Sequence, residues 1–184
     1  MRRTAWWIGA LAGAGLTVAV GLAARAAARA RLEPMLVQGE SMRPTLVPGQ
    51  RIAVGPLPKP LPRGAVVVVR HPEREGFEVV KRVVGLPGER MRLVGGRLEV
   101  DGLQLREPYL AGAAPAPGGA AGRGAVALDV LLGADEYLVL GDNRDASSDG
   151  RAFGPVRTQD LVGQVRFAYW PPHRLPPPSN IRTS

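Results

Sequence analysis

The chain has 184 residues and a formal net charge of +8, which allows one domain with at most a small extension. It has no cysteine and only two histidines, which excludes disulfides and thiolate metal sites and argues against a histidine-based triad or a multi-histidine metal centre. The basic balance fits nucleic acid or an anionic membrane as a partner, but the charges are scattered singly.

The first 31 residues predict a membrane anchor. Ala5–Ala24 is a run of 20 residues without a charge, which as a helix of about 30 Å is long enough to cross a bilayer. Trp6 and Trp7 lie at one end, where interfacial aromatic residues belong. Arginines flank both ends, so the positive-inside rule barely decides the orientation. A cleaved signal peptide is the alternative, but its apolar core is usually shorter.

From Leu32 onward, short runs rich in β-branched residues are separated by Gly and Pro, which is typical of strands and turns. The sequence Val94-Gly-Gly-Arg97 predicts a hairpin. We expect an all-β catalytic domain over residues 32–170, with antiparallel sheets that form a partly open, barrel-like fold, preceded by one N-terminal transmembrane α-helix. The predicted strands are 36–37, 51–54, 65–70, 78–84, 90–94, 97–100, 137–140 and 161–169.

Three further segments complete the predicted organisation. Residues 111–125 are rich in Ala, Gly and Pro and predict an extended or flexible loop. They fall inside a short accessory region at about 101–132. Residues 171–184 are rich in proline and predict an extended C-terminal tail.

The scarcity of lysine draws attention to Lys81. Only Lys59 and Lys81 occur among the 24 Lys and Arg residues, and Lys81 stands in the run VVKRVVGLPGE. Arginine cannot lose its proton in a protein, whereas a buried lysine can have its pKa lowered until it acts as a base. Ser41 in GESMRPTL is a possible partner, because a serine nucleophile with a lysine base is a known variant of the Ser-His-Asp arrangement. On these residues alone, a solvated strand lysine and a turn serine remain the alternative.

The segment GDNRDASSDGRAFGPV, residues 141–156, is dense in turn-forming and charged residues. Its spacing of oxygen-bearing side chains could indicate a calcium loop. However, Arg144 and Arg151 would place positive charge in the cage, and no suitably placed glutamate closes the loop. We therefore interpret this segment mainly as a salt-bridged structural loop.

Taken together and in this order, GESMRPTL, VVKRVVGLPGE and GDNRD resemble the bacterial type I signal peptidases, the membrane-bound Ser-Lys proteases that remove signal peptides. The resemblance covers about residues 33–170. It implies a serine endopeptidase without cofactor or metal that cuts after small residues of the Ala-x-Ala type. It also implies that Ser41 is the nucleophile, Lys81 the general base, and Ser147 a second serine that orients the lysine amine.

The resemblance implies further roles around the site. One set is structural and consists of two salt-bridging pairs and a connecting motif: Arg82 with Asp142, Asp149 with Arg151, and Asn143, Arg144 and Asp145. A second set lines shallow pockets for small side chains: Met35, Val37, Met42, Leu46, Val79 and Val80. Gly39 departs from those members that carry a serine two residues before the nucleophile, so the Ser41 backbone N–H is the expected oxyanion donor.

The implied partners are preprotein signal peptides and the lipid bilayer, without nucleic acid. We expect a single-pass protein of the plasma or inner membrane, with its catalytic domain on the extracytoplasmic side. A self-cleaving repressor peptidase shares the Ser-Lys chemistry, but it would need a DNA-binding domain where this chain has an apolar segment. A membrane-tethered, basic β-barrel that binds nucleic acid is the alternative that is not an enzyme. It would need aromatic residues on the surface among the basic residues.

Overall fold

The structure, a computed structural model, describes residues 32–110, 126–173, 175 and 182–183. The chain divides into two units, Met1–Leu32 and Glu33–Ser184, and every strand belongs to the second unit. The anchor predicted over residues 1–31 and the loop predicted over residues 111–125 lie outside the described residues. Within the described part of the chain, no helix is both long and apolar enough to cross a bilayer.

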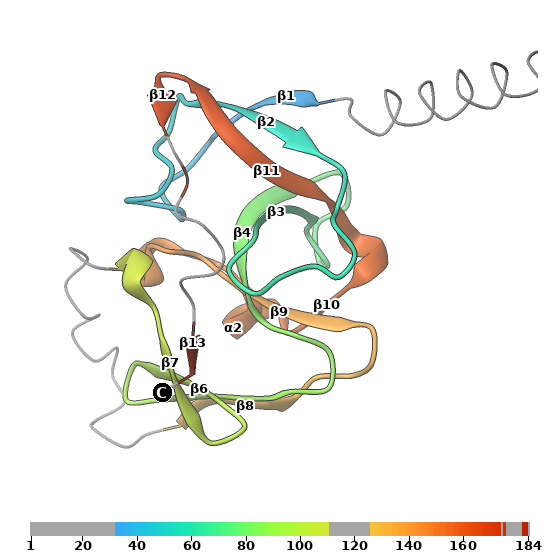
Figure 1. Ribbon diagram of the computed structural model, residues 1–184, viewed down its shortest axis with the longest axis vertical. Helices are drawn as coiled ribbons and strands as arrows, with labels where there is room; N and C mark the ends of the chain where they lie inside the picture. The colour runs from blue at the N-terminus through green and yellow to red at the C-terminus, as the bar shows by residue number, and fades with distance from the viewer. Residues whose placement is uncertain (1–31, 111–125, 174, 176–181, 184) are drawn as a thin grey trace, which may run out of the picture. The chain divides into compact units, whose positions relative to one another are not determined.

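An antiparallel sheet of eight strands curls into an open half-barrel (Figure 1). Its strand order is β1-β2-β11-β3-β4-β9-β10, and β12 pairs with β11. The strands are β1 (Glu33–Leu36), β2 (Arg51–Gly55), β3 (Val66–Arg70), β4 (Glu78–Gly85), β9 (Glu136–Leu140), β10 (Val156–Arg157), β11 (Leu161–Trp170) and β12 (Pro172–His173). Since β1 and β10 are the two ends of this order, the barrel stays open.

The valine run of β3 is buried on both faces of this sheet. Val66 and Val68 pack into one apolar cluster, and Val67 and Val69 pack into another. Successive side chains of a strand point to opposite faces, so four consecutive buried valines require a core on each side. This double burial accounts for a continuous, rather than alternating, apolar pattern in the sequence.

A second antiparallel sheet has five strands in the order β13-β7-β6-β5-β8. The strands are β5 (Arg90–Val94), β6 (Arg97–Val100), β7 (Leu103–Arg106), β8 (Val126–Leu131) and β13 (Arg182–Thr183). Val94 pairs with Arg97, which confirms the predicted hairpin. Its two turn residues, Gly95 and Gly96, have φ values of 56° and 80°, which only glycine adopts readily and which the tightest hairpin turn requires.

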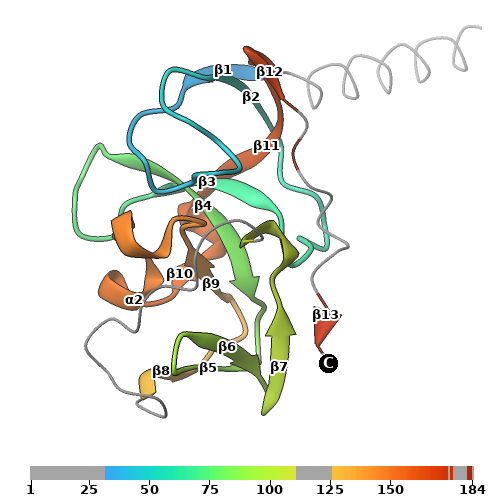
Figure 2. The same cartoon turned by 90° about the vertical axis from the view of Figure 1, so that its left-hand side faces the viewer.

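Two connections of the chain join the two sheets. The chain passes from β4 in the first sheet to β5 in the second, and it returns from β8 to β9 (Figure 2). Val84 at the end of β4 and Leu138 and Leu140 in β9 pack in one cluster with Met91 and Leu98 of the second sheet. The second sheet is therefore held directly against the strand that carries Lys81.

Helices are limited to single turns in the described residues. They are η1 (Pro108–Leu110), η2 (Arg144–Ala146), α2 (Gly150–Phe153) and η3 (Thr158–Asp160). Asp149 caps α2, because its side chain accepts a hydrogen bond from the Arg151 backbone N–H. The prediction of an all-β domain with antiparallel, partly open barrel-like sheets is thus confirmed for the described residues.

The second sheet and the C-terminal segment extend differently from the expected organisation. The five-stranded sheet begins at Arg90, so it extends beyond the expected accessory region at about 101–132. Strands β12 and β13 lie within the segment 171–184 that we expected to be an extended tail. The pairing of β13 with β7 has a simple cause, because an edge strand offers unpaired backbone groups to any extended segment nearby.

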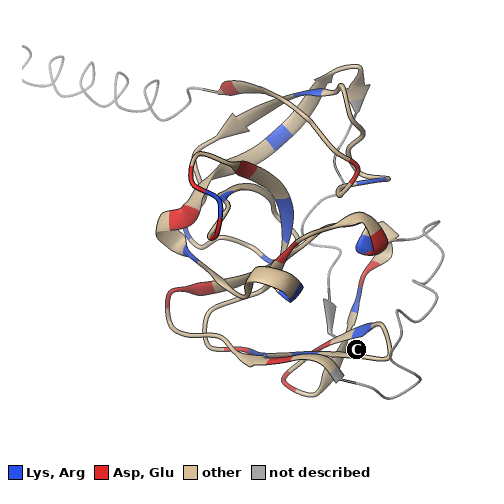
Figure 3. Cartoon of the chain, turned by 180° about the vertical axis from the view of Figure 1, so that it is seen from behind, with Lys and Arg blue, Asp and Glu red and all other residues tan. Residues whose placement is uncertain are grey.

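Charged residues are mixed over both sheets. Figure 3 shows basic and acidic positions interspersed on the described part of the fold. Many of them are paired, including Arg63 with Glu89 and Arg90 with Asp129.

Candidate active site

Ser41 and Lys81 are in direct contact. The distance between Lys81 Nζ and Ser41 Oγ is 2.8 Å, which is a hydrogen bond. Ser41 lies in the turn after β1, whereas Lys81 lies in the middle of β4, so the fold joins residues 40 positions apart. Lys81 is only 3% exposed. The arrangement is therefore a hydroxyl beside a buried amine.

Burial gives Lys81 an unusual pKa. Removal of the amine from water lowers its pKa from 10.5 to about 8, because the charged form loses its hydration. The negative charge of Asp149 opposes this effect, and the positive charge of Arg151 adds to it. A lysine with this pKa is neutral in a substantial fraction of molecules at mildly alkaline pH, so it can accept a proton.

The loop that carries Ser41 is fixed from both sides. Its start is held by a hydrogen bond from the Val37 backbone N–H to Gln50 O, at 2.8 Å. On the other side, the Asn143 backbone N–H donates to Ser41 O at 2.9 Å, and Asn143 Nδ2 donates to Glu40 O at 3.2 Å. The Ser41 backbone N–H has no acceptor within the described residues. That N–H remains available to a ligand.

Ser147 lies beside the same loop, with Gly141 between them. The Ser147 hydroxyl oxygen is buried and makes no well-formed hydrogen bond within the described residues. A Cβ atom at Gly141 would lie 2.2 Å from Ser147 Oγ and 2.6 Å from Ser41 O. Only a residue without a side chain fits between these two groups. The structure thus brings Ser147 close to Ser41, although it shows no direct hydrogen bond from Ser147 to Lys81.

Arg82 and Asp142 form a buried ion pair. Arg82 Nε donates to Asp142 Oδ1 at 2.8 Å, and Arg82 Nη2 donates to Asp142 Oδ2 at 2.6 Å. Both side chains are 1% exposed. The remaining donors of Arg82 bond to Gly64 O and to Thr45 Oγ1. A bidentate pair with further hydrogen bonds is the arrangement in which two buried charges can be tolerated.

Asp149 and Arg151 form the second pair. Arg151 donates to both carboxylate oxygens of Asp149, and the Gly141 backbone N–H donates to Asp149 Oδ2 at 2.9 Å. Burial by itself raises the pKa of Asp149, but the hydrogen bonds from Arg151 and Gly141 lower it below its ordinary value. Asp149 therefore stays ionised and keeps a negative charge near Lys81.

Arg144 and Asp145 belong to the same motif but differ in burial and in ion pairing. Arg144 is largely buried and its Nε donates to Gly141 O at 3.0 Å. Asp145 is exposed and forms no ion pair with the described residues. No group of three or more carboxylate, histidine or cysteine side chains that could hold a metal ion occurs among the described residues.

Two residues near the site were not predicted from the sequence. Glu107 accepts hydrogen bonds from Arg144 and from the Tyr109 hydroxyl. The Tyr109 ring lies against the Arg82 guanidinium, whose central carbon is 4.1 Å from the ring centre. The only signal in the sequence is Glu-Pro-Tyr in a chain with three tyrosines, and nothing in that signal relates it to Arg82 or Arg144.

A cavity of about 150 Å³ opens beside the pair. It contains five of the six predicted pocket residues: Met35, Val37, Met42, Val79 and Val80. The structure does not bring Leu46 to this cavity. Leu46 is fully buried in the adjacent core, because the turn after Ser41 directs it inward against Ile52. Leu36, Gln38, Gly39 and Glu78 also line the cavity and were not in the predicted set.

Two strand edges border this cavity. Strand β1 pairs only with β2, so its other edge has no partner strand among the described residues. Strand β4 pairs with β3 along Glu78–Arg82, but its pairing with β9 begins only at Arg82. The segment Glu78–Lys81 therefore has one edge free of a described strand. Two such edges beside a cavity can accept an extended peptide.

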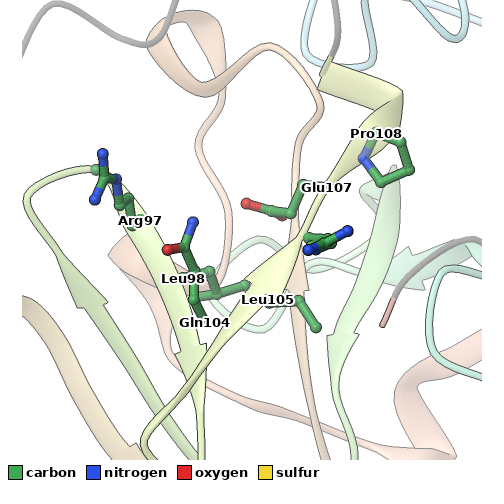
Figure 4. A pocket seen from close by; sticks show the side chains of 8 residues that line it. Arg97, Leu98, Gln104, Leu105, Glu107 and Pro108 are labelled. Carbon is green, nitrogen blue, oxygen red and sulfur yellow. The ribbon is translucent and has the colours of Figure 1, made fainter. Parts of the chain in front are cut away.

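A larger cavity of about 690 Å³ lies on the second sheet, away from Ser41 and Lys81. Side chains of β6 and β7 line it, including Arg97, Leu98 and Leu105, with Glu107 and Pro108 at the end of β7 (Figure 4). Its size does not make it the reactive site, because it contains no nucleophile beside a base.

The site places a serine hydroxyl beside a buried lysine amine, and comparison with known proteins gives the family. The family model described as signal peptidase, peptidase S26, matches residues 10–170. The chain therefore belongs to the signal peptidase family, and it is an enzyme of the signal peptidase class.

Two relatives matched by sequence agree with this assignment. The chain is 37% identical over 150 residues to a signal peptidase IB of Staphylococcus aureus, a match that covers 75% of this chain and 78% of that protein. It is 35% identical over 182 residues to a signal peptidase I of Leptolyngbya laminosa, with 90% and 82% covered. A crystal structure of a signal peptidase I from Enterococcus faecalis aligns with 29% identity and a TM-score of 0.49, over 56% of this chain and 95% of that one.

Proposed function

We propose that Ser41 is the nucleophile and Lys81 the general base of a reaction that hydrolyses the peptide bond between a signal peptide and an exported protein. The observation that carries the proposal is the 2.8 Å contact of Ser41 Oγ with an amine whose burial lowers its pKa to about 8. A serine hydroxyl becomes a strong nucleophile only when a neighbouring base takes its proton. The neutral amine of Lys81 can do so without a histidine.

The reaction then follows two steps. Ser41 Oγ attacks the carbonyl carbon while Lys81 Nζ takes the hydroxyl proton, and the resulting ammonium passes that proton to the leaving amine. Water next attacks the acyl carbonyl with Lys81 again as the base, the bond between that carbon and Ser41 Oγ breaks, and the lysine ammonium returns the proton to Ser41 Oγ. The negative oxygen that forms in each step is stabilised by the Ser41 backbone N–H, because Gly39 offers no side-chain donor. The Ser147 hydroxyl aims the Lys81 amine.

Substrate binds by strand addition between β1 and the Glu78–Lys81 segment of β4. Main-chain hydrogen bonds to two strand edges hold an extended peptide without reading its sequence. Alternate side chains of the peptide point into the cavity, whose volume of about 150 Å³ favours small residues. Residues Met35, Val37, Met42, Val79 and Val80 set this preference for Ala-x-Ala.

The parts of the chain also determine where the enzyme acts relative to the membrane. Residues 1–31 form a single membrane-spanning anchor, residues 32–170 the catalytic domain on the extracytoplasmic side, and residues 171–184 a tail. Exposed apolar side chains support contact with lipid: Leu36 and Trp170 both pair with Arg51, so the three stand side by side on one sheet face. Leu36 is 55% exposed and Trp170 is 64% exposed. Aromatic and arginine side chains together suit the membrane interface.

The catalytic assignment is tested with the purified full-length chain in detergent and a peptide that spans a signal-peptide cleavage site. Ser41→Ala and Lys81→Ala should each abolish cleavage and leave the fold intact. Lys81→Arg is the sharper variant, because it keeps charge and approximate length but cannot supply a base. Lys59→Arg is the matched control. Retention of more than about a few per cent of activity in Lys81→Arg would contradict the general-base role.

The location is tested separately in cells. Protease added to spheroplasts should digest the catalytic domain but spare a tag placed before Met1. A protected catalytic domain would contradict both the orientation and the extracytoplasmic site of action.

A further inference from the structure

The residues that follow β7 form a cluster of side-chain contacts that has no role in the reaction described above. Glu107 and Tyr109 stand on either side of Pro108, where the second sheet leads into η1. The Glu107 carboxylate accepts a hydrogen bond from the Tyr109 hydroxyl and an ion-paired bond from each of two Arg144 nitrogens. The Arg144 and Glu107 side chains are 11% and 9% exposed, so the pair is nearly removed from water.

Arg144 connects Glu107 to the backbone beside Ser41 and Ser147. Its Nε donates to Gly141 O at 3.0 Å, and its own carbonyl accepts from Arg151 Nη2 at 2.7 Å. Gly141 is the residue whose Cα separates Ser147 from the Ser41 carbonyl. A displacement of Arg144 would therefore move Gly141, which lies beside both serines.

Tyr109 makes a second contact, with the residue next to Lys81 in β4. Its buried ring lies 4.1 Å from the central carbon of the Arg82 guanidinium, and Arg82 follows Lys81 in β4. Arg82 in turn holds Asp142, which follows Gly141. One short segment that follows β7 thus contacts both the strand with the base and the loop with Ser147.

We propose that Glu107 and Tyr109 are positioning residues that clamp the loop of residues 141–151 onto β4 and thereby fix Ser147 and the Ser41 loop relative to Lys81. The proposal rests on the Ser41–Lys81 reaction proposed above. Neither residue lines the 150 Å³ cavity in which substrate is placed. The clamp therefore acts on the chemical step and leaves substrate affinity unchanged.

The test compares kcat and KM of full-length variants in detergent, with thermal unfolding followed in parallel. Glu107→Gln should lower kcat roughly 10- to 100-fold, since a displacement of about 1 Å is enough for such a loss, and should leave KM within about twofold. Glu99→Gln is the matched control. It makes the same change in the same sheet, on a more exposed ion pair with Arg92, and both parameters should stay within about twofold.

Tyr109 supplies an independent pair of variants, which decides the question if Glu107→Gln fails to fold. Both Tyr109→Phe and Tyr109→Leu keep the Glu107–Arg144 ion pair, but only Tyr109→Phe keeps an aromatic face over Arg82. We expect Tyr109→Leu to lose kcat at constant KM and Tyr109→Phe to recover most of it.

The outcomes separate the two proposals. If the wild type cleaves, Ser41→Ala does not, and folded Glu107→Gln and Tyr109→Leu keep kcat within about twofold of the wild type, the clamp is refuted and the Ser41–Lys81 reaction stands. An increase in KM alone, or an equal loss in Glu99→Gln, refutes the clamp as well. If Ser41→Ala cleaves as the wild type does, the reaction proposed above fails and the clamp fails with it.

Discussion

Replacement of Lys81 by methionine should make the protein more stable at neutral pH while it abolishes activity. Lys81 is 3% exposed, and burial lowers its pKa from 10.5 to about 8. The difference of about 2.5 corresponds to about 3 kcal/mol at about 1.36 kcal/mol per pH unit. At pH 7 the amine is protonated in both the folded and the unfolded chain, so the folded state carries this cost. Methionine has a similar length and no charge, so it removes the cost.

The sign of the pH dependence follows from the two pKa values. Between about pH 8 and 10.5 the unfolded chain binds more protons at this lysine than the folded chain does, so the free energy of unfolding rises with pH. From about pH 7 to pH 9.5, the wild type should gain about 2 kcal/mol of stability relative to Lys81→Met. Tyr109, whose pKa is raised by burial, titrates above this range and contributes equally to both proteins.

The measurement is denaturant unfolding of both full-length proteins in detergent micelles, followed by far-ultraviolet circular dichroism at several pH values. Ser41→Ala serves as the control, because it removes the hydrogen-bond partner but keeps the titrating amine. A constant difference between wild type and Lys81→Met over this pH range would refute the reasoning. It would mean that Lys81 titrates as an ordinary solvated lysine.

Four other predictions test the site. Since the neutral amine of Lys81 is the active form, kcat/KM should rise about tenfold from about pH 7 to pH 9. Gly141→Ala should destabilise the fold by roughly 2 kcal/mol and lower kcat by at least about 100-fold, because its Cβ would overlap the Ser147 hydroxyl. Asp142→Asn should destabilise by about 3 kcal/mol or more, because it leaves the charge of Arg82 buried without its partner. Chelators should leave activity unchanged.

Each of these predictions has either a control variant or a result that would contradict it. A flat pH profile would exclude a base with a pKa near 8. Gly133→Ala is the control for the glycine, because its Cβ would meet only the side chain of Glu136, at 3.2 Å, and the change should be mild. Asp129→Asn removes a more exposed carboxylate partner of Arg90 and should change stability far less than Asp142→Asn does. Activity lost in chelator and restored by calcium would revive the calcium interpretation of residues 142–149.

The strands that the sequence predicted correctly are those with a continuous valine run or with apolar residues that alternate with charged ones. The runs at 90–94 and 97–100 match β5 and β6, and the valine-rich run at 65–70 differs from β3 by one residue. Strand β7, with the sequence Leu-Gln-Leu-Arg, was missed because three of its four residues are exposed and none is β-branched. Strand β8 was missed because it directly follows an Ala- and Gly-rich segment.

The site residues could be predicted only where they belong to a short, recognisable sequence motif. The motifs around Ser41, Lys81 and Asp142 are compact in sequence, so they could be read without a structure. The roles of Glu107 and Tyr109 depend on a contact between two sheets, which no local pattern encodes. Leu46 was misplaced for the same reason, since the direction of a turn decides whether a leucine faces the cavity or the core.

The staggered start of β9 has a consequence for where substrates are cut. A peptide strand added along Glu78–Lys81 meets β9 at Arg82, where Leu140 already occupies the neighbouring position. If substrate binds as proposed, it would extend no further along β4, and the start of β9 would limit the position of each signal peptide. The cleaved bond would then be chosen by distance from the start of β9 as well as by side-chain size. Precursors that slip by one residue would present their side chains to the wrong face and escape cleavage.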